Sequence, residues 1–175
     1  MPKNLNVFLV GPMGSGKTAV GRQLSQRLQL DFIDADDEIE RRTGVDIPYI
    51  FDKEGEAGFR LREREVIDEL TARSHVVVAT GGGAVLDAGT RARLRARGQV
   101  VYLRASVKQQ LTRTRRSAKR PLLNNADPRE TLERLMNDRA PLYEDVADIC
   151  VNTDGRKVRT VVDEIESALR STGMS

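Results

Sequence analysis

The chain has 175 residues, of which 39% are hydrophobic and 31% are charged, and its formal net charge is +3. This length suits one domain with its own core over residues 1–175, and no apolar run approaches the roughly 20 residues of a membrane span. The chain enters a strand-like segment almost at once and has a single cysteine, so we expect a cytoplasmic protein without disulfides or a membrane partner.

The first strand-like segment, residues 6–10, leads into the sequence Gly-Pro-Met-Gly-Ser-Gly-Lys-Thr at positions 11–18. This is a complete phosphate-binding loop, and the helical spacing of apolar residues over 17–28 supplies its strand–loop–helix context. The glycines let backbone N–H groups approach phosphate oxygens, Lys17 is expected to reach the β- and γ-phosphates, and the Thr18 hydroxyl to ligate Mg²⁺. The predicted nucleotide site comprises Gly14, Ser15, Gly16, Lys17, Thr18 and Ala19.

Two carboxylates follow the second strand-like segment, residues 31–33. Asp34 and Asp36 are two residues apart, so on an extended chain their side chains lie on the same side, and at the carboxyl end of a strand they would face the ligand cleft. One would hold metal-bound waters and the other would accept a proton from a substrate hydroxyl. We assign the metal to Asp34, because the third strand leads to glycines and not to an aspartate. The alternative is that Asp36 caps a helix over residues 36–43.

A charged helix is predicted over residues 58–72, with Arg60 near its start, and a third strand over residues 76–80. The third strand ends in Gly81, Gly82 and Gly83, and three glycines after a buried strand predict a close approach of backbone to a ligand. The alternative is a tight turn from strand to helix. Arg60 is a candidate for recognition of a carboxylate or phosphate, because the guanidinium group binds such anions as a fork.

The rest of the chain continues the alternation, with helices predicted over residues 88–96, 107–113, 128–143 and 156–169 and strands over residues 100–103 and 149–151. Residues 113–127 are basic and polar without apolar periodicity, so we predict a mobile lid that contains Arg120. Arg139 is a second candidate for anion recognition, and Pro141 is expected to stiffen a turn after it. Cys150 is predicted to be a buried thiol in the last strand.

Strands and helices that alternate in this way predict an α/β fold with a five-stranded, mostly parallel sheet and helices on both of its faces. In such a fold, ligands bind at the carboxyl ends of the strands. The candidate residues above lie just after strands or in the loops between elements, as that rule requires.

The sequence resembles the shikimate kinase family over residues 6–169. Six motifs carry the resemblance, in this order: Gly11–Thr18, Asp34-x-Asp36, Gly58-Phe59-Arg60, Gly81-Gly82-Gly83, Arg120-Pro121-Leu122-Leu123 and Arg139-x-Pro141-Leu142-Tyr143. The resemblance implies a P-loop fold of the nucleoside-monophosphate-kinase type, with a substrate-binding region at about residues 34–62 and a lid at about residues 113–127. It implies Mg²⁺- and ATP-dependent phosphorylation of the 3-hydroxyl of shikimate, in the pathway to chorismate and the aromatic amino acids.

The resemblance also implies residue roles. Asp36 is expected to bind the ring hydroxyls and act as the base, and Arg60 and Arg139 to grip the carboxylate of shikimate. Gly82, between Gly81 and Gly83, is expected to contact the substrate through its N–H.

On the nucleotide side, the resemblance places Arg120 on the ATP phosphates as a catalytic residue together with Lys17 and Asp36. Arg113 and Arg156 are placed beside the adenine. One Mg²⁺ ion is expected with ATP, ATP and shikimate are the expected partners, and the protein is expected to be a monomer.

Three other functions remain open at this stage. One is another small-metabolite kinase of the same fold, acting on gluconate or a nucleoside monophosphate. A GTPase-type binding module is suggested by Asp52-Lys53-Glu54-Gly55, but this motif does not end a strand and no guanine-recognition motif accompanies it. A nucleic-acid-binding ATPase is suggested by two clusters of basic residues, at 91–97 and 113–120. It is disfavoured, because no aromatic residues are interleaved with either cluster, so we expect no nucleic-acid partner.

Overall fold

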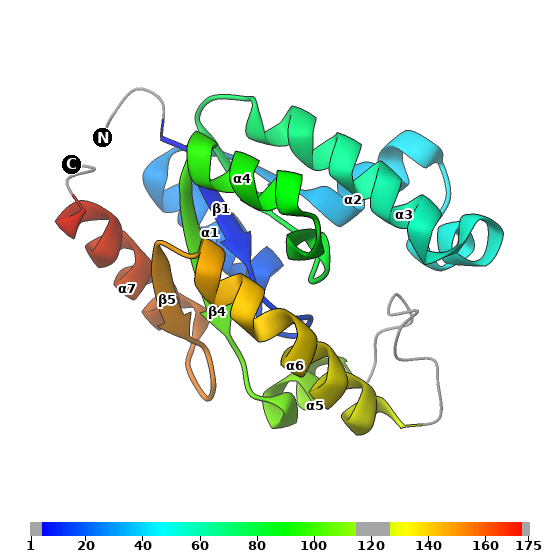
Figure 1. Cartoon of the computed structure of the whole chain (residues 1–175). Coiled ribbons are helices and arrows are strands. Elements are labelled where there is room, and N and C mark those ends of the chain that lie inside the picture. The colour runs from blue at the N-terminus through cyan, green and yellow to red at the C-terminus, as the bar shows by residue number, and fades with distance from the viewer. Residues whose placement is uncertain (1–4, 115–126, 173–175) are drawn as a thin grey trace.

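The computed structural model describes residues 5–114 and 127–172. In this part of the chain, five strands form one sheet in the order β2-β3-β1-β4-β5, and each neighbouring pair is parallel (Figure 1). The strands are β1 (Val7–Val10), β2 (Asp31–Asp34), β3 (Val76–Ala79), β4 (Gln99–Arg104) and β5 (Ile149–Asn152). The predicted five-stranded parallel sheet is confirmed.

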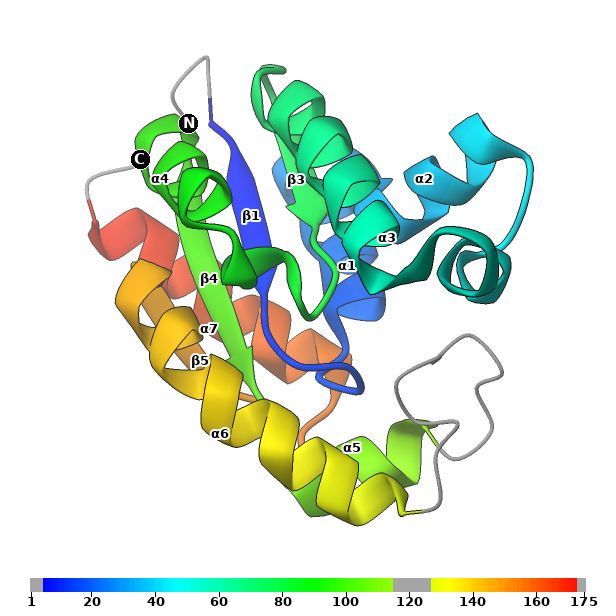
Figure 2. The same cartoon turned by 45° about the vertical axis from the view of Figure 1, so that its right-hand side comes forward.

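Helices cover both faces of the sheet. They are α1 (Lys17–Leu28), α2 (Ala35–Thr43), α3 (Ile47–Thr71), α4 (Ala88–Arg97), α5 (Val107–Thr114), α6 (Pro128–Val146) and α7 (Val158–Ser171), with a short 3₁₀ helix η1 (Ala84–Leu86). Figure 2 shows α4 and α6 on one side of the sheet and α1 and α7 on the other. None of the helices in the described ranges is both long and apolar enough to cross a membrane.

The alternation of side chains along β1 divides the core into two layers. Phe8 and Val10 pack into a cluster with residues of α2, α3 and α6, whereas Val7 and Leu9 pack into a second cluster with residues of α1 and α7. All four side chains are fully buried, as expected for a central strand of a parallel sheet. The buried strands therefore fix the loops at their carboxyl ends on a rigid base.

Two elements differ from the prediction. Helix α3 begins at Ile47, well before the predicted start at residue 58, and it is two helical pieces that meet at a kink at Gly55 (φ 74°, ψ 177°). Pro141, predicted to stiffen a turn, lies inside α6. The proline costs one helical hydrogen bond, but Tyr143 and Val146 beyond it are buried in the core, and their packing carries the helix onward.

The prediction for Cys150 was also wrong, because its side chain is exposed. Strand β5 is at the edge of the sheet, and along it Ile149 and Val151 are buried whereas Cys150 and Asn152 are exposed. The apolar run around Cys150 concealed this alternation, in which only one face of an edge strand is covered.

The kink at Gly55 generates the first testable prediction. A φ of 74° with a ψ of 177° is a conformation that only glycine adopts readily, so Gly55→Asn should lower the free energy of unfolding by about 1–3 kcal/mol. Gly44, which ends α2 at φ 74° and ψ 8°, is the matched control, since asparagine is tolerated in that left-handed conformation. Urea unfolding of both variants measures the difference, and equal losses would contradict the assignment of strain to Gly55.

Candidate active site

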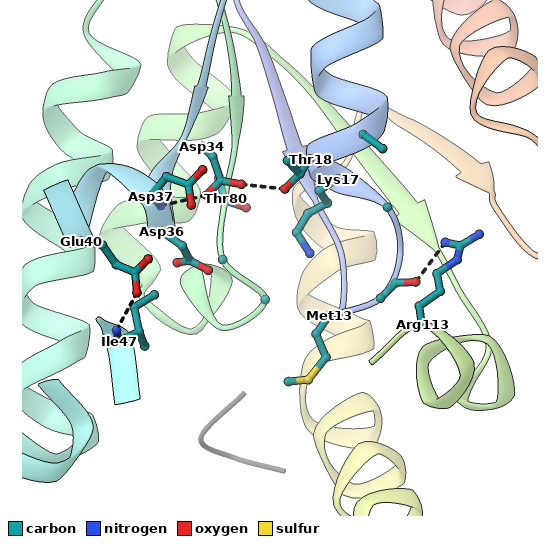
Figure 3. A pocket seen from close by; sticks show the side chains of 15 residues that line it. Met13, Lys17, Thr18, Asp34, Asp36, Asp37, Glu40, Ile47, Thr80 and Arg113 are labelled. Atoms are coloured by element: carbon teal, nitrogen blue, oxygen red, sulfur yellow. Dashed lines mark hydrogen bonds between the residues drawn. The ribbon is translucent and has the colours of Figure 1, made fainter. Parts of the chain in front are cut away.

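A cleft of about 390 Å³ opens at the carboxyl ends of β1, β2 and β3 (Figure 3). Its walls come from the phosphate-binding loop, from the start of α2, from the loop after β3 and from α5. The residues that line it are Met13, Gly14, Gly16, Lys17, Thr18, Ala19, Asp34, Asp36, Asp37, Glu40, Ile47, Thr80, Gly81, Gly82 and Arg113. The fold therefore gathers at one place most of the residues that the sequence singled out for nucleotide and acceptor binding.

The phosphate-binding loop has the backbone that its glycines permit. Gly14 and Gly16 have φ values of 77° and 91°, and Gly16 is the residue from which α1 starts. The Nζ atom of Lys17 donates hydrogen bonds to the carbonyl oxygens of Gly11 and Pro12, at 2.7 and 2.9 Å. The loop thus presents the N-terminus of a 12-residue helix to the cleft, which is a favourable place for an anion.

Asp34 links the phosphate-binding loop to α2. The Thr18 hydroxyl donates a hydrogen bond to Asp34 Oδ2 at 2.7 Å, and Asp34 Oδ1 accepts one from the backbone N–H of Asp37 at 3.1 Å. Asp34 is therefore the N-cap of α2, and the alternative in which Asp36 caps this helix was wrong. A hydroxyl and a carboxylate in contact offer oxygen ligands of the kind that Mg²⁺ prefers.

Asp36 faces the cleft, but not for the reason given from the sequence. It lies in the first turn of α2, not on an extended chain, and the helix directs it toward the loop after β3. Asp37 and Glu40 of the same helix also line the cleft, opposite Lys17 and Thr18 (Figure 3). Neither residue was predicted from the sequence, although Glu40 lies four residues after Asp36 and three after Asp37, a spacing that brings helical residues to one side.

The triple-glycine loop is packed against charged side chains on several sides. A Cβ atom added at Gly81 would lie 2.7 Å from Glu63 Oε2 and 2.9 Å from Asp36 Oδ1, and one at Gly83 would overlap the guanidinium of Arg60. At Gly82 the nearest side-chain atom would be Arg139 Nη1, at 3.5 Å. The loop is therefore more than a tight turn, because side chains at Gly81 and Gly83 would displace the charged groups around it.

Arg60, which is partly buried, and Glu63, which is buried, form an ion pair on α3 behind this loop. Arg60 Nη1 donates to Glu63 Oε1 at 2.9 Å, and Arg60 Nη2 lies 3.2 Å from Glu56 Oε1. Glu63 is only 3% exposed, and its Oε2 atom has no hydrogen-bond partner among the described residues. Burial raises the pKa of Glu63, an effect that the positive charge of Arg60 opposes.

The two predicted carboxylate-binding arginines lie on different elements. Arg60 lines a neighbouring hollow of about 360 Å³ rather than the main cleft, and Arg139 lies on α6 with an exposure of only 4%. Both are next to the triple-glycine loop, at Gly83 and Gly82 respectively.

Glu63 was not predicted from the sequence. The feature that could have indicated it is a charged residue one helical turn after Arg60, on the same face of α3 as Val66 and Ile67, which are buried in the core.

Arg113 and Arg156 gather at the turn between β5 and α7. Arg113 donates to the carbonyl oxygens of Gly14 (3.0 Å) and Thr153 (3.4 Å), while Arg156 donates through Nη1 to the carbonyl oxygen of Asn152 (2.8 Å). Arg113 lines the cleft and Arg156 does not. Arg120 and residues 115–126 of the predicted lid lie outside the described residues.

Comparisons with known proteins agree on one family. The family model described as "Shikimate kinase" matches residues 13–170. The proteins named "Shikimate kinase 1" from Salmonella newport and Salmonella enteritidis are each 53% identical to this chain over 172 residues, which is 98% of this chain and 99% of the relative.

Solved structures give the same result. The shikimate kinase from Acinetobacter baumannii in complex with shikimate has a TM-score of 0.96 at 47% identity and covers 99% of this chain and 97% of its own. The shikimate kinase from Aquifex aeolicus has a TM-score of 0.85 at 35% identity, over 97% and 98% of the two chains. A gluconokinase from Sinorhizobium meliloti, with a TM-score of 0.62 at 16% identity over 98% of this chain and 95% of its own, shares the fold alone.

The buried carboxylate of Glu63 predicts a pH-dependent stability. Its pKa is raised in the folded protein, so its contribution to stability is fully present below the ordinary pKa of 4.5 and is lost as the pH rises through the higher folded value. Glu63→Gln cannot titrate. The unfolding free energy of the wild type minus that of Glu63→Gln should therefore fall as the pH rises above 4.5.

Urea unfolding at a series of pH values measures this difference. Glu65→Gln replaces an exposed glutamate of the same helix and controls for the substitution itself. A difference that stays flat or grows with pH would show that the ion pair with Arg60, and not burial, sets the pKa of Glu63.

Proposed function

This chain belongs to the shikimate kinase family, and we propose that the cleft described above binds both of its substrates and carries out the reaction. The enzyme is an ATP-dependent phosphotransferase that converts shikimate to shikimate 3-phosphate, in the biosynthesis of aromatic amino acids. One observation supports the location best: the phosphate-binding loop, Asp36 and the triple-glycine loop all line a single cleft. A phosphoryl donor and a hydroxyl acceptor bound there are neighbours, as in-line transfer requires.

We propose that the phosphate-binding loop holds ATP through Gly14, Ser15, Gly16, Lys17, Thr18 and Ala19. Lys17 lines the cleft with its Nζ atom on loop carbonyls, so the charge is already held at the edge of the site. Arg113, which bridges the loop to the β5–α7 turn, and Arg156 on that turn are proposed to flank the adenine. Arg120 is proposed, from the sequence motif, to contact the phosphates during transfer.

Two side chains, one at the start of α1 and one at the N-cap of α2, fit one Mg²⁺ ion. Thr18 and Asp34 are proposed to hold it, because their side-chain oxygens are in contact and face the cleft beside the loop. When bound, such an ion neutralises charge on the transferring phosphoryl group. Among the described residues no cluster of three or more histidine, cysteine, aspartate or glutamate side chains is arranged for a metal.

On the acceptor side, Asp36 is proposed to take the proton from the 3-hydroxyl. Arg60, Arg139 and the backbone of Gly81, Gly82 and Gly83 are proposed to bind the carboxylate. The support is that all of these groups approach one loop, although Arg60 opens to the neighbouring hollow. The proposed proton acceptor, Asp36, is next to Gly81, whereas the arginines proposed to bind the carboxylate are next to Gly82 and Gly83. This separation suits a small acid that carries hydroxyl groups.

Residues 34–62 are proposed as the substrate-binding region and residues 113–127 as the lid of a single domain over 1–175. In support, α2 and the first part of α3 extend beyond the sheet (Figure 1), and Asp36 and Glu40 of α2 and Ile47 of α3 line the cleft. We further propose a cytoplasmic monomer that binds ATP and shikimate and no nucleic acid or membrane. The support for a monomer is that the cleft brings together the groups proposed for the donor phosphates, the metal and the proton acceptor without a residue from a second copy.

Release of ADP with Mg²⁺-ATP and a panel of acceptors tests the function. Shikimate, gluconate, CMP, AMP and no acceptor are compared, and turnover is expected with shikimate alone. Activity on gluconate or a nucleotide in its place would leave the fold intact and overturn the substrate, whereas GTP binding without turnover would favour a GTPase-type module.

A separate prediction isolates the role of Asp34. Asparagine caps helices as well as aspartate does, so Asp34→Asn should preserve α2 while it removes the negative charge beside Thr18. The Mg²⁺ concentration for half-maximal activity should rise by about tenfold or more. Titration of Mg²⁺ at saturating shikimate measures this concentration. Asp37→Asn, which makes the same change in the first turn of α2, is the matched control. An unchanged Mg²⁺ requirement in Asp34→Asn would remove Asp34 from the metal site.

A further inference from the structure

Tyr143 is a buried polar residue that has no assigned part in the proposed reaction. Its side chain on α6 is fully buried, and its hydroxyl donates a hydrogen bond of 2.5 Å to the carbonyl oxygen of Gly82, 61 residues away in the sequence. A buried hydroxyl with a distant backbone partner joins two elements that no local turn connects. Here the two elements are α6 and the triple-glycine loop of the cleft.

The hydrogen bond from Tyr143 differs from the others that shape this loop. The carbonyl oxygen of Gly81 accepts from Ala84 N–H, and that of Gly83 accepts from Leu86 N–H, both at 3.1 Å within the local turn. Only the carbonyl of Gly82, of the three, is held by a side chain from another element. The orientation of the Gly82–Gly83 peptide therefore depends on α6.

Because a trans peptide is planar, the hydrogen bond to the Gly82 carbonyl also sets the direction of the Gly83 N–H. The described chain has no cis peptide bonds, so the N–H of Gly83 points opposite to the carbonyl of Gly82. Because that carbonyl points to Tyr143, the N–H of Gly83 points away from α6. Neither Gly82 N–H nor Gly83 N–H donates to another residue in the described part of the chain, so both are suited to an anion.

The same hydroxyl is next to Arg139. Arg139 and Tyr143 are four residues apart on α6 and so lie on one face of the helix. A Cβ atom added at Gly82 would lie 3.5 Å from Arg139 Nη1, so the guanidinium is close to the same glycine. Burial raises the pKa of Tyr143, and the charge and hydrogen bond of Arg139 act in the opposite direction. The net increase keeps the hydroxyl protonated at neutral pH, so it remains a donor to the loop.

We propose that Tyr143 is a positioning residue for the carboxylate of the acceptor. Its hydroxyl fixes the Gly82–Gly83 peptide, and with it the direction of the Gly83 N–H, in a loop that Arg139 approaches at Gly82 and Arg60 at Gly83. The backbone N–H and the guanidinium groups can then bind one anionic group together. This inference rests on the proposed function, because it concerns how the same cleft recognises its acceptor. It assigns Tyr143 an effect on acceptor binding that burial of its ring alone would not produce.

Two variants that lose the same atom test the proposal. Tyr143→Phe removes the hydroxyl and keeps the ring, and Tyr102→Phe is the control, because Tyr102 is also buried, stacks on Tyr143 at 5.0 Å and makes no hydrogen bond to the loop. Each is assayed with shikimate and with its methyl ester, which keeps the 3-hydroxyl but carries no charge.

For Tyr143→Phe, the KM for shikimate should rise by about tenfold, as expected when a buried carbonyl loses its donor. The preference for shikimate over the ester, measured as the ratio of kcat/KM values, should fall by a similar factor, while the KM for ATP stays within about twofold. Tyr102→Phe should leave all three quantities close to those of the wild type.

Equal losses on shikimate and the ester, or an unchanged KM for shikimate, would overturn the proposal and leave Tyr143 a packing residue. Wild-type protein that fails to turn over shikimate would instead overturn the proposed function. If Tyr143→Phe lowers the melting temperature, calorimetric titration with shikimate and with the ester, well below that temperature, measures the same discrimination without turnover.

Discussion

Close approach of charged side chains to three glycines after β3 is the constraint on which the site depends. Glu63 and Asp36 meet at Gly81, Arg139 reaches Gly82, and Arg60 lies against Gly83. These residues come from α2 and α3, which follow each other in the chain, and from α6, which is far from both in the sequence. They can converge only because the loop between them presents backbone and no side chains. The shape of the site therefore depends on the absence of a Cβ atom at these three glycines.

The charges in this site are arranged in partly compensated groups. Arg60 is held between Glu56 and Glu63, so its charge is shared with two carboxylates before any acceptor binds. Glu63 is buried deeply enough that desolvation outweighs that attraction and raises its pKa. An anionic acceptor that enters beside Arg60 would therefore complete a cluster whose positive charge is already oriented, and little rearrangement of side chains is needed.

Local patterns in the sequence were sufficient for most of the fold. The strand–loop–helix around Gly11–Thr18 could be predicted because a fixed motif lies between an apolar strand segment and a segment with helical spacing of apolar residues. Helix α1 begins and ends at the predicted residues 17 and 28. The start of α3 was missed, since Pro48 and Gly55 suggest loop whereas Ile47 and Ile50 are buried and hold the helix to the core.

The site was less accessible from sequence than the fold. Asp34 and Asp36 were predicted as site residues, but their positions at the start of α2 depend on the residue at which the strand ends and the helix begins. A sequence pattern predicts that boundary only to within a few residues. Glu63 and Tyr143 were missed as site residues because each belongs to an ordinary helical pattern. Their importance arises from contacts across more than one element, which no local period encodes.

The exposed edge position of Cys150 has a practical consequence. It is the one cysteine of the sequence, it is exposed on β5, and it is not among the residues that line the cleft. A thiol-reactive fluorophore would therefore attach at a single known point without prior removal of other cysteines. Together with a second dye introduced on α2, it would report in single molecules how far the acceptor side of the cleft moves relative to the sheet.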